Sequence, residues 1–429
     1  MRRRLISVLA IAAGSLLLAA CVSDGGGPPE SANTSRGPIE VWLSTNPEEV
    51  AWGEQVVASW NSQHPDEQVT AQQIPAGKTS EEVIYSSIVA GNAPCVVLNT
   101  APSAVPQFQQ AGGLVALDTF PDGDSYVEAR TGKEIADQYR SPDGRFYQIP
   151  WKVNPVMIFY NKKLFAEAGL DPENPPLATW DEFLQTSRTL VQKGVAPAAI
   201  WPAPSSEFFQ SWFDYYPMSA ARTQQQLVED GKATFDSPDG VAVGNFWRTM
   251  YAEKLAPQEK YNGDSFKDGA AAMASAGPWA IPVYKDTIDW GVVPIPTEDG
   301  KPADQIYTFS DEKSLAIYYA CEHRLTAWDF VKSATTEAAD GELLELTGQM
   351  PMRQNLPEVY ASYFATHPDY EQFADQAGRV VEVPNVQNST EIWQTFRNAW
   401  TSAVVFDDEP IDKAFADAAA RANELLAEE

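Results

Sequence analysis

The sequence predicts an α/β protein built from two lobes. Its 429 residues are enough for roughly two to four domains of about 150 residues each, and for large buried cores. Short β-rich runs alternate with segments of helical periodicity, which is typical of βαβ units and a mostly parallel sheet. Hydrophobic residues make up 44% of the chain and charged residues 21%, values that indicate a globular protein rather than a disordered one.

The individual elements follow from local patterns. Thr179 and Glu182 fit a capping box, which predicts a helix from there to about residue 193. Apolar residues at three- and four-residue steps predict a closing amphipathic helix over 411–429. Two more helices are expected at 48–63 and 81–91. The expected strands are 39–43, 69–74, 95–98, 155–160, 198–201, 270–274, 291–294 and 314–319.

Residues that follow strands are the first binding candidates, because ligands of α/β sheets bind beyond the carboxyl ends of the strands. In this sequence they are Ser44, Asn46, Asn99, Thr100, Trp151, Lys152 and Asn154, and Arg353 follows a further strand-like run at 350–352. Most of these side chains can donate or accept hydrogen bonds. The pattern predicts a polar ligand site at one edge of a sheet.

The N-terminus is typical of an export signal. An arginine-rich start precedes an apolar run that ends at Ala20 and is too short for a comfortable membrane span. Leu18-Ala19-Ala20-Cys21 resembles the bacterial lipobox, whose cleavage leaves a lipid-modified cysteine at the new N-terminus. We therefore expect a signal peptide over 1–20, lipidation of Cys21 and a flexible Ser/Gly/Pro-rich tether over 21–37. The alternative is an ordinary secretory signal with a chance cysteine.

Charge and motif content exclude several classes of function. The chain holds 30 Lys+Arg against 59 Asp+Glu, a formal net charge of −29, which disfavours nucleic-acid binding and docking of a basic patch on anionic lipid. GxSxG, GxxxxGK, GxGxxG and HExxH are absent, and the three histidines are far apart, so we expect no metal and no cofactor. Cys95 and Cys321 could pair in an oxidising compartment or remain two buried thiols.

Several segments, in their order along the chain, carry a family resemblance. They are GGLVAL (112–117), YQIPWKVNPVMIFYNKKLF (147–165), PLATWDEF (176–183), AAMASAGPWAIPV (271–283), DWGVVPIP (289–296) and the late segment 384–403. Together they resemble the extracellular solute-binding proteins, family 1, of ABC importers, the family that includes maltose-binding protein. With the lipobox, the resemblance spans essentially the whole mature chain.

The resemblance implies a two-lobed periplasmic-binding-protein fold of type II, maltose-binding-like, with a ligand cleft that closes by a hinge motion. The expected N-terminal lobe is 38–152 plus 302–350, and the expected C-terminal lobe is 153–301 plus 351–429. It further implies an extracytoplasmic, monomeric, non-catalytic protein. Such a protein would capture a sugar, in this case an oligosaccharide, and deliver it to ABC permease subunits, with lipidated Cys21 as its membrane attachment.

Sugar recognition needs aromatic faces for the C–H faces of the ring and planar polar groups for the hydroxyls. By the resemblance, Trp279 and Trp393 match positions that stack on sugar, and Glu207 and Phe208 match an acid-plus-aromatic contact. Asn154 falls where the family has a hydroxyl-binding carboxylate. The expected ligand-binding residues are Ser44, Asn46, Asn99, Thr100, Trp151, Lys152, Asn154, Glu207, Phe208, Trp279, Arg353 and Trp393.

Three alternatives to a sugar importer stay open from the sequence. The same fold could bind a polyol, glycerol phosphate, a polyamine or a metal chelate, and the family's charged pair is replaced here by Asn46-Pro47. A secreted lipoprotein enzyme acting on glycans is the second, because 59 acids make some carboxylate pair inevitable. The third is a surface adhesion or scaffold protein that kept the fold without transport.

Overall fold

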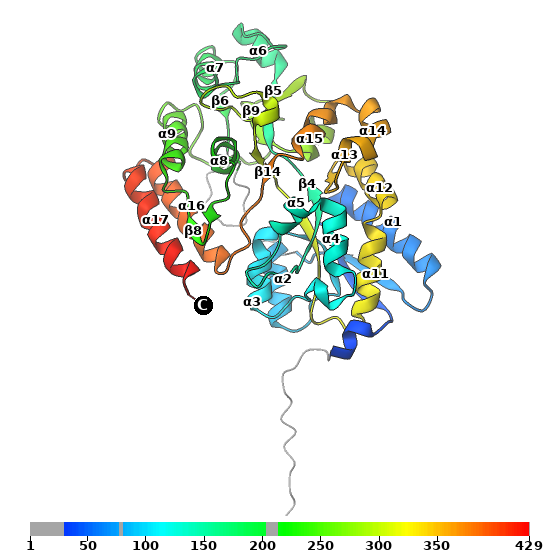
Figure 1. Ribbon diagram of the computed structural model, residues 1–429. Helices are drawn as coiled ribbons and strands as arrows, with labels where there is room; N and C mark the ends of the chain where they lie inside the picture. The colour runs from blue at the N-terminus through cyan, green and yellow to red at the C-terminus, as the bar shows by residue number, and fades with distance from the viewer. Residues whose placement is uncertain (1–29, 77–79, 203–212, 429) are drawn as a thin grey trace, which may run out of the picture.

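The computed structural model describes residues 30–76, 80–202 and 213–428, which form two lobes, each built around its own sheet (Figure 1). The N-terminal lobe holds a six-stranded sheet in the order β13-β4-β12-β3-β1-β2. Its strands are β1 (Ile39–Leu43), β2 (Val69–Gln73), β3 (Val96–Thr100), β4 (Ile149–Val153), β12 (Lys313–Ile317) and β13 (Met350–Pro351). The C-terminal lobe holds a four-stranded sheet in the order β10-β5-β9-β6. Its strands are β5 (Met157–Asn161), β6 (Ala198–Ile200), β9 (Ala271–Ala276) and β10 (Trp290–Val293).

The expectation of a mostly parallel sheet is wrong. Parallel pairing joins β1 to β2 and β3, and β6 to β9, where the chain runs through consecutive βαβ units. The remaining pairs within the two large sheets are antiparallel. The reason is that the chain crosses between the lobes more than once, and β12 returns into the first sheet in the opposite direction to β3 and β4.

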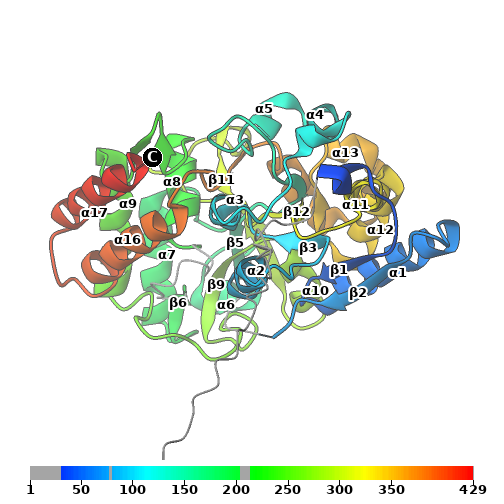
Figure 2. The same ribbon diagram turned by 90° about the horizontal axis from the view of Figure 1, so that it is seen from below.

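Helices cover both sheets and widen the molecule at its two ends. Around the first sheet lie α1 (Pro47–Gln63), α2 (Ser80–Val89), α3 (Val105–Gln110), α4 (Gly123–Thr131), α5 (Lys133–Asp137), α11 (Arg324–Ala334) and α12 (Glu337–Thr347). Helices α1, α11 and α12 lie at one end of the molecule, and α16 (Ser389–Trp400) and α17 (Ile411–Leu426) lie at the other (Figure 2). The remaining helices are α6 (Lys162–Ala168), α7 (Trp180–Gln192), α8 (Tyr215–Thr223), α9 (Pro238–Ala252), α10 (Ile281–Tyr284), α13 (Leu356–Val359), α14 (Ala361–Thr366) and α15 (Glu371–Gln376).

Local sequence signals place several of these helix ends. Helix α7 begins with the predicted capping box, in which Thr179 and Glu182 satisfy each other's backbone N–H groups. Helix α17 buries Phe415, Ala418 and Leu425 along one face, as its spacing predicts. No helix within residues 30–76, 80–202 and 213–428 has both the length and the apolar composition that a membrane crossing needs.

Cys95 and Cys321 form a disulfide in the N-terminal lobe. Cys95 immediately precedes β3, and Cys321 lies just after β12, its antiparallel neighbour. The backbone N–H of Tyr318 donates to the Cys95 carbonyl at 3.0 Å. Of the two possibilities that the sequence left open, pairing is therefore the one that the structure adopts.

Residues 30–37 pack on the N-terminal lobe, although the sequence places them in the flexible tether. Residues Glu30–Thr34 form a 3-10 turn in which Ala32 is buried. The Arg36 guanidinium forms ion pairs with Glu67 and Asp329, 2.9 and 2.5 Å away. These specific contacts offset the conformational entropy that the polar segment loses when it is ordered.

The lobes are joined by a three-stranded set of connections that we call the crossover ribbon, residues 154–156, 308–312 and 380–382. Short strands β11 (Thr308–Phe309) and β14 (Val380–Val381) pair in parallel within it. The first connection bonds to the second through the N–H of Val156 and the carbonyl of Phe309, 2.9 Å apart. The N–H of Asp311 donates to the carbonyl of Asn154 at 3.1 Å. The connections are therefore hydrogen-bonded to one another rather than independent.

Candidate functional site

The crossover ribbon brings the ligand-facing edges of the two sheets close together. Strand β4 ends at Val153 in the first sheet, and β5 begins at Met157 in the second, four residues or about 14 Å of extended chain later. Met157 pairs with Ala276 at the end of β9. Trp279 lies three residues after Ala276. Candidate residues after β4 and after β9 are thus neighbours across the two lobes.

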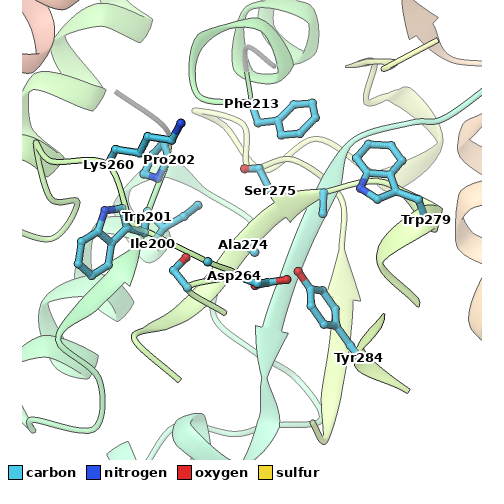
Figure 3. Close-up of a pocket in the computed structure, with 13 residues that line it drawn as sticks. Ile200, Trp201, Pro202, Phe213, Lys260, Asp264, Ala274, Ser275, Trp279 and Tyr284 are labelled. Atoms are coloured by element: carbon cyan, nitrogen blue, oxygen red, sulfur yellow. The ribbon is translucent and has the colours of Figure 1, made fainter. Parts of the chain in front are cut away.

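A pocket of about 520 Å³ opens at the carboxyl ends of β6 and β9 (Figure 3). Trp201 and Trp279 lie on opposite sides of it, with Phe213 and Ser275 between them. Its lining residues are Ile200, Trp201, Pro202, Phe213, Lys260, Gly263, Asp264, Ser265, Ala274, Ser275, Ala276, Trp279 and Tyr284. Large aromatic surfaces with a few polar groups between them are what a small polar ligand with apolar ring faces needs.

Trp279 is held in place by the backbone beneath it and by two hydrophobic clusters. Its indole packs against the buried residues of both clusters, and the Phe213 ring lies 5.8 Å away between centroids. A Cβ on Gly277 would overlap this indole. The Gly277-Pro278-Trp279 turn is therefore shaped so that the ring can fold back over residue 277 and still line the pocket.

The polar floor of the pocket is a carboxylate and a phenol. The Asp264 side chain accepts the backbone N–H groups of Phe266 and Lys267 at 3.1 and 2.9 Å, which fixes the loop that carries it. Burial raises the pKa of the Tyr284 hydroxyl, and its hydrogen bond to Asp264 raises it further. Tyr284 therefore stays a neutral hydrogen-bond donor, and Asp264 is an acceptor beside it (Figure 3).

A buried ionic network lies at the corresponding edge of the N-terminal sheet. The Lys152 ammonium at the end of β4 contacts Oε1 of Glu49 at 2.7 Å, with 1% and 5% of the two side chains exposed. Gln349, just before β13, donates its side-chain amide to the same Glu49 carboxylate. The network joins α1, β4 and β13 at one point.

Glu49 is held ionised by this network. Burial alone would raise the pKa of its carboxyl. The Lys152 ammonium and the hydrogen bonds from Lys152, Gln349 and Ser44 oppose burial and hold that pKa below its usual range. The site thus contains a fixed, compensated pair of opposite charges rather than a free charge.

Asn99 and Asn154 attach to the same network. The Asn99 side-chain oxygen lies 3.4 Å from the Lys152 ammonium. The Asn154 amide donates to the Asp311 carbonyl at 3.1 Å and approaches the Gln349 oxygen at 3.4 Å. Its Oδ1 receives no hydrogen bond from any residue that the structure describes. The structure therefore brings together Asn99, Lys152 and Asn154, three of the residues that the sequence singles out.

Four other predicted residues carry contacts within the N-terminal lobe. The Ser44 hydroxyl accepts the N–H of Asn46 at 3.1 Å, and the Asn46 side chain caps α1 by accepting the N–H of Glu49. Thr100 is fully buried with its hydroxyl 3.1 Å from that of Tyr318. Trp151 is 1% exposed and packs against Trp52 with 5.2 Å between ring centroids. Ser44 and Asn46 reach the ionic network through Glu49, and the Trp151 ring lies 4.5 Å from the Lys152 ammonium.

The last predicted residues lie elsewhere or outside the described chain. Arg353 forms an ion pair with Asp340 and donates to the Thr335 carbonyl at 2.6 Å, on the far side of β13. Trp393 is fully buried in the core of the C-terminal lobe, so its indole offers no exposed face in this structure. Cys21, Glu207 and Phe208 lie outside the residues that the structure describes.

Sequence reasoning missed Glu49, Gln349, Trp201, Asp264 and Tyr284. Trp201 could have been found, because it ends an expected strand and ligands bind beyond strand ends. Glu49 stands at the third helical position after Asn46, where an acid is ordinarily an exposed partner of the helix N-terminus. Nothing local distinguishes a buried acid there. Asp264 and Tyr284 meet only in the fold.

No group of three or more His, Cys, Asp and Glu side chains in the described ranges is arranged to hold a metal ion. Residues 44–341 match the family described as bacterial extracellular solute-binding protein. That match covers well over half of the 429 residues.

Individual relatives of this chain are also named as binding proteins. The chain is 25% identical over 318 residues to a maltotriose-binding protein of Pyrococcus abyssi, covering 72% of this chain and 64% of that protein. It is 23% identical over 377 residues to the diacetylchitobiose binding protein DasA of Streptomyces coelicolor, covering 83% of each. The crystal structure of the cyclic alpha-maltosyl-1,6-maltose binding protein from Arthrobacter globiformis superposes with a TM-score of 0.76 at 20% identity, over 92% of this chain and 100% of that one. At that identity the superposition shows a shared two-domain fold.

Proposed function

The chain belongs to the bacterial extracellular solute-binding proteins, and from this we propose that it captures a carbohydrate between its lobes and delivers it to an ABC permease. An oligosaccharide is the ligand that we favour. The family places the protein outside the cytoplasm. The relatives named above bind maltotriose and diacetylchitobiose, which supports a carbohydrate ligand here.

The pocket between Trp201 and Trp279 is the observation that carries the proposal. Two indoles on opposite sides of about 520 Å³ of space suit the apolar faces of sugar rings. Asp264, Tyr284 and Ser275 supply acceptors and donors for hydroxyls between them. A ligand that contacts both indoles would extend across the pocket, which favours more than one sugar ring.

The second wall of the proposed site is the edge that carries Asn99, Lys152 and Asn154. The free Oδ1 of Asn154 can accept from a sugar hydroxyl when the lobes close. Ser44 and Asn46 are kept as neighbours of this wall, and Glu207 and Phe208 as residues whose role rests on the resemblance. We leave Trp151 and Trp393 out of the proposed site, because their rings are buried and have no exposed face for a sugar ring. We leave Thr100 out because its buried hydroxyl is hydrogen-bonded to that of Tyr318, and Arg353 because it is paired with Asp340.

We also propose the lobe division 38–152 plus 302–350 and 153–301 plus 351–429, with closure about the crossover ribbon. The strands of the two large sheets fall on either side of this division, except that the last residues of β4 and β13, Val153 and Pro351, lie one residue beyond its limits. Membrane attachment through lipidated Cys21 is proposed from the lipobox-like Leu18-Ala19-Ala20-Cys21. Incorporation of labelled palmitate into the native chain, and its loss in Cys21→Ser, would test that attachment.

A thermal-shift panel tests the ligand class, because a ligand that binds only the native state raises the melting temperature. The panel contains mono- and oligosaccharides, polyols, glycerol phosphate and polyamines. A shift with oligosaccharides alone, without turnover of the sugar, is the expected result. A shift confined to glycerol phosphate or a polyamine would replace the carbohydrate by that solute, and release of product would make the protein an enzyme.

Transport is tested in the source cell. Deletion of the gene should abolish uptake of the solute that shifts the melting temperature, and the native gene should restore it. Normal uptake after deletion would reject delivery to a permease, and would move the protein to the adhesion or scaffold class even if it binds a sugar.

A further inference from the structure

Two buried glutamates lie side by side in the crossover ribbon. Glu312 is 2% exposed and stands between β11 and β12, and Glu382 is 3% exposed and follows β14 directly. Because Phe309 of β11 pairs in parallel with Val381 of β14, both acids leave the same short pair of strands in the same direction. Their side chains lie within hydrogen-bonding range of each other.

A hydrogen bond between two carboxyl groups needs a proton, because two ionised carboxylates have no donor. Oε1 of Glu382 accepts the backbone N–H of Val383 at 2.7 Å. The other oxygen of Glu382 and both oxygens of Glu312 receive nothing from a protein donor in the part of the chain that the structure describes. Burial, and then the neighbouring acid, raise the pKa of Glu312 well above its usual range. Burial raises the pKa of Glu382 to about 7, against the hydrogen bonds that it accepts.

The charged groups around the pair do not neutralise it. Lys313 is the adjacent cation, but its ammonium binds the Asp311 carboxylate and the Glu312 backbone carbonyl, each at 3.0 Å. Glu81 faces Lys313 from α2, and Asp311 adds a further negative charge near Glu382. On the other side, the Tyr216 hydroxyl donates to the backbone carbonyl of Glu382 at 2.8 Å.

The location of the pair couples it to lobe movement. Hinge motions between lobes are absorbed by φ/ψ changes in the few residues that connect them. Glu312 and Glu382 stand on two of the three connections of the crossover ribbon, at the point where those connections separate toward different lobes. A change in the angle between the lobes must therefore change the distance between the two carboxyl groups or their burial.

From this placement we infer that the Glu312–Glu382 pair is a proton-operated hinge element, which holds the lobe arrangement seen here while it shares a proton. Loss of that proton leaves two carboxylates facing each other in a buried space, and like charges at close range repel strongly there. The lobes then shift to an arrangement that separates or hydrates the two groups. The inference does not depend on a bound solute, so its test is independent of the proposed ligand.

Distance measurement between the lobes tests the inference directly. Spin labels are placed at Val89→Cys on α2 and Lys163→Cys on α6, both exposed positions (67% and 74%). Helix α2 belongs to the N-terminal lobe and α6 to the C-terminal lobe, and the two helices are well separated in Figure 1. The full chain carries Cys21→Ser to remove a third reactive thiol. Dipolar spectroscopy is recorded at about pH 5.5 and about pH 8.5, below and above the pKa of about 7 of Glu382.

The otherwise native chain is expected to shift its mean label distance between the two pH values. Glu312→Gln and Glu312→Gln/Glu382→Gln should hold one distance at both pH values, because a neutral amide can donate to its neighbour and two like charges then never face each other. Glu371→Gln, at an exposed acid of α15, is the matched control and should shift like the native chain. An unchanged distance in the native chain, or a shift that persists in the double variant, would overturn the inference.

A second measurement covers the case in which the glutamine variants fold poorly. Infrared spectra of the native chain should contain a protonated-carboxyl band at about pH 6, where ordinary acids are fully ionised. That band should disappear as the pH is raised. Absence of this band at about pH 6 would show that the pair holds no shared proton, and would overturn the inference.

Discussion

The ammonium of Lys152 lies 2.7 Å from the carboxylate of Glu49, and both side chains are almost fully buried. The pair joins the last residues of β4 to the first turn of α1 at the edge where the cleft is proposed. A buried pair costs desolvation energy for both charges, and the energy is recovered only while both partners are present.

Removing one partner is therefore expected to lower the free energy of unfolding strongly. Lys152→Met should lower the free energy of unfolding by about 3–5 kcal/mol, because it leaves a buried uncompensated carboxylate. The double variant Glu49→Gln/Lys152→Met should lose less than the sum of the single variants. Urea unfolding measures all three. Lys133→Met, at an exposed pair with Asp137, is the control and should change by about 1 kcal/mol or less; an equally small loss in Lys152→Met would contradict the buried pair.

The free energy of unfolding should fall at acid pH, in part because Glu49 becomes protonated. Its pKa in the folded state lies below the ordinary value of 4.5, so the unfolded chain binds more protons than the folded one between those values. The contribution is complete above the ordinary pKa and is lost as the pH falls through the folded pKa. Urea midpoints from about pH 6 to about pH 3 should therefore fall less steeply in Glu49→Gln than in the native protein. Parallel curves would assign the acid sensitivity to other carboxylates.

Opening the disulfide should destabilise the N-terminal lobe without altering ligand recognition. Cys95 and Cys321 close a loop with a sequence separation of 226. Replacing both by alanine should cost about 2–5 kcal/mol, mainly by freeing the unfolded chain. Chemical unfolding of the variant should match that of the reduced native protein, and a reducing agent should leave the variant unchanged. Equal stability of native and variant proteins would show that the cross-link contributes nothing.

Trp279 and Trp393, which the sequence predicts to stack on sugar, should have different roles. Trp393→Ala should lower the free energy of unfolding by about 3–5 kcal/mol, because it empties a fully buried site. Trp279→Ala should retain most of the stability and lose the ligand-induced rise in melting temperature. Trp279→Phe, which keeps an aromatic face, should recover part of that rise. Calorimetry with the solute found by the panel measures affinity; unchanged affinity in Trp279→Ala would remove this indole from the site.

Much of the architecture was readable because it depends on local periodicity. The capping box at Thr179, the closing helix and most strands followed from patterns within a dozen residues. The sequence does not predict strand β4, and Trp151 and Lys152, which are predicted to follow a strand, lie inside it; Asn99 and Thr100 likewise lie inside β3. A continuous buried run of this kind has no alternation, so its pattern does not separate strand from loop.

The site was less predictable because its residues meet only through the fold. Lys152 and Asn154 were found from their place in the chain, but Glu49 and Gln349, which bind them, are separated by 300 positions. Asp264 and Tyr284 likewise come from a loop and a short helix. Spacing alone likewise does not decide whether Cys95 pairs with Cys321, because the two residues meet only in the fold.

The central position of β12 has a consequence for the order of folding. This strand lies between β3 and β4 in the first sheet, yet it is synthesised after the whole second sheet. Until Lys313–Ile317 emerges, β3 and β4 have no partner between them, and the N-terminal lobe lacks its middle. Pairing over such long sequence separations is intrinsically slow. The first lobe to be made is therefore completed only after the strands of the second.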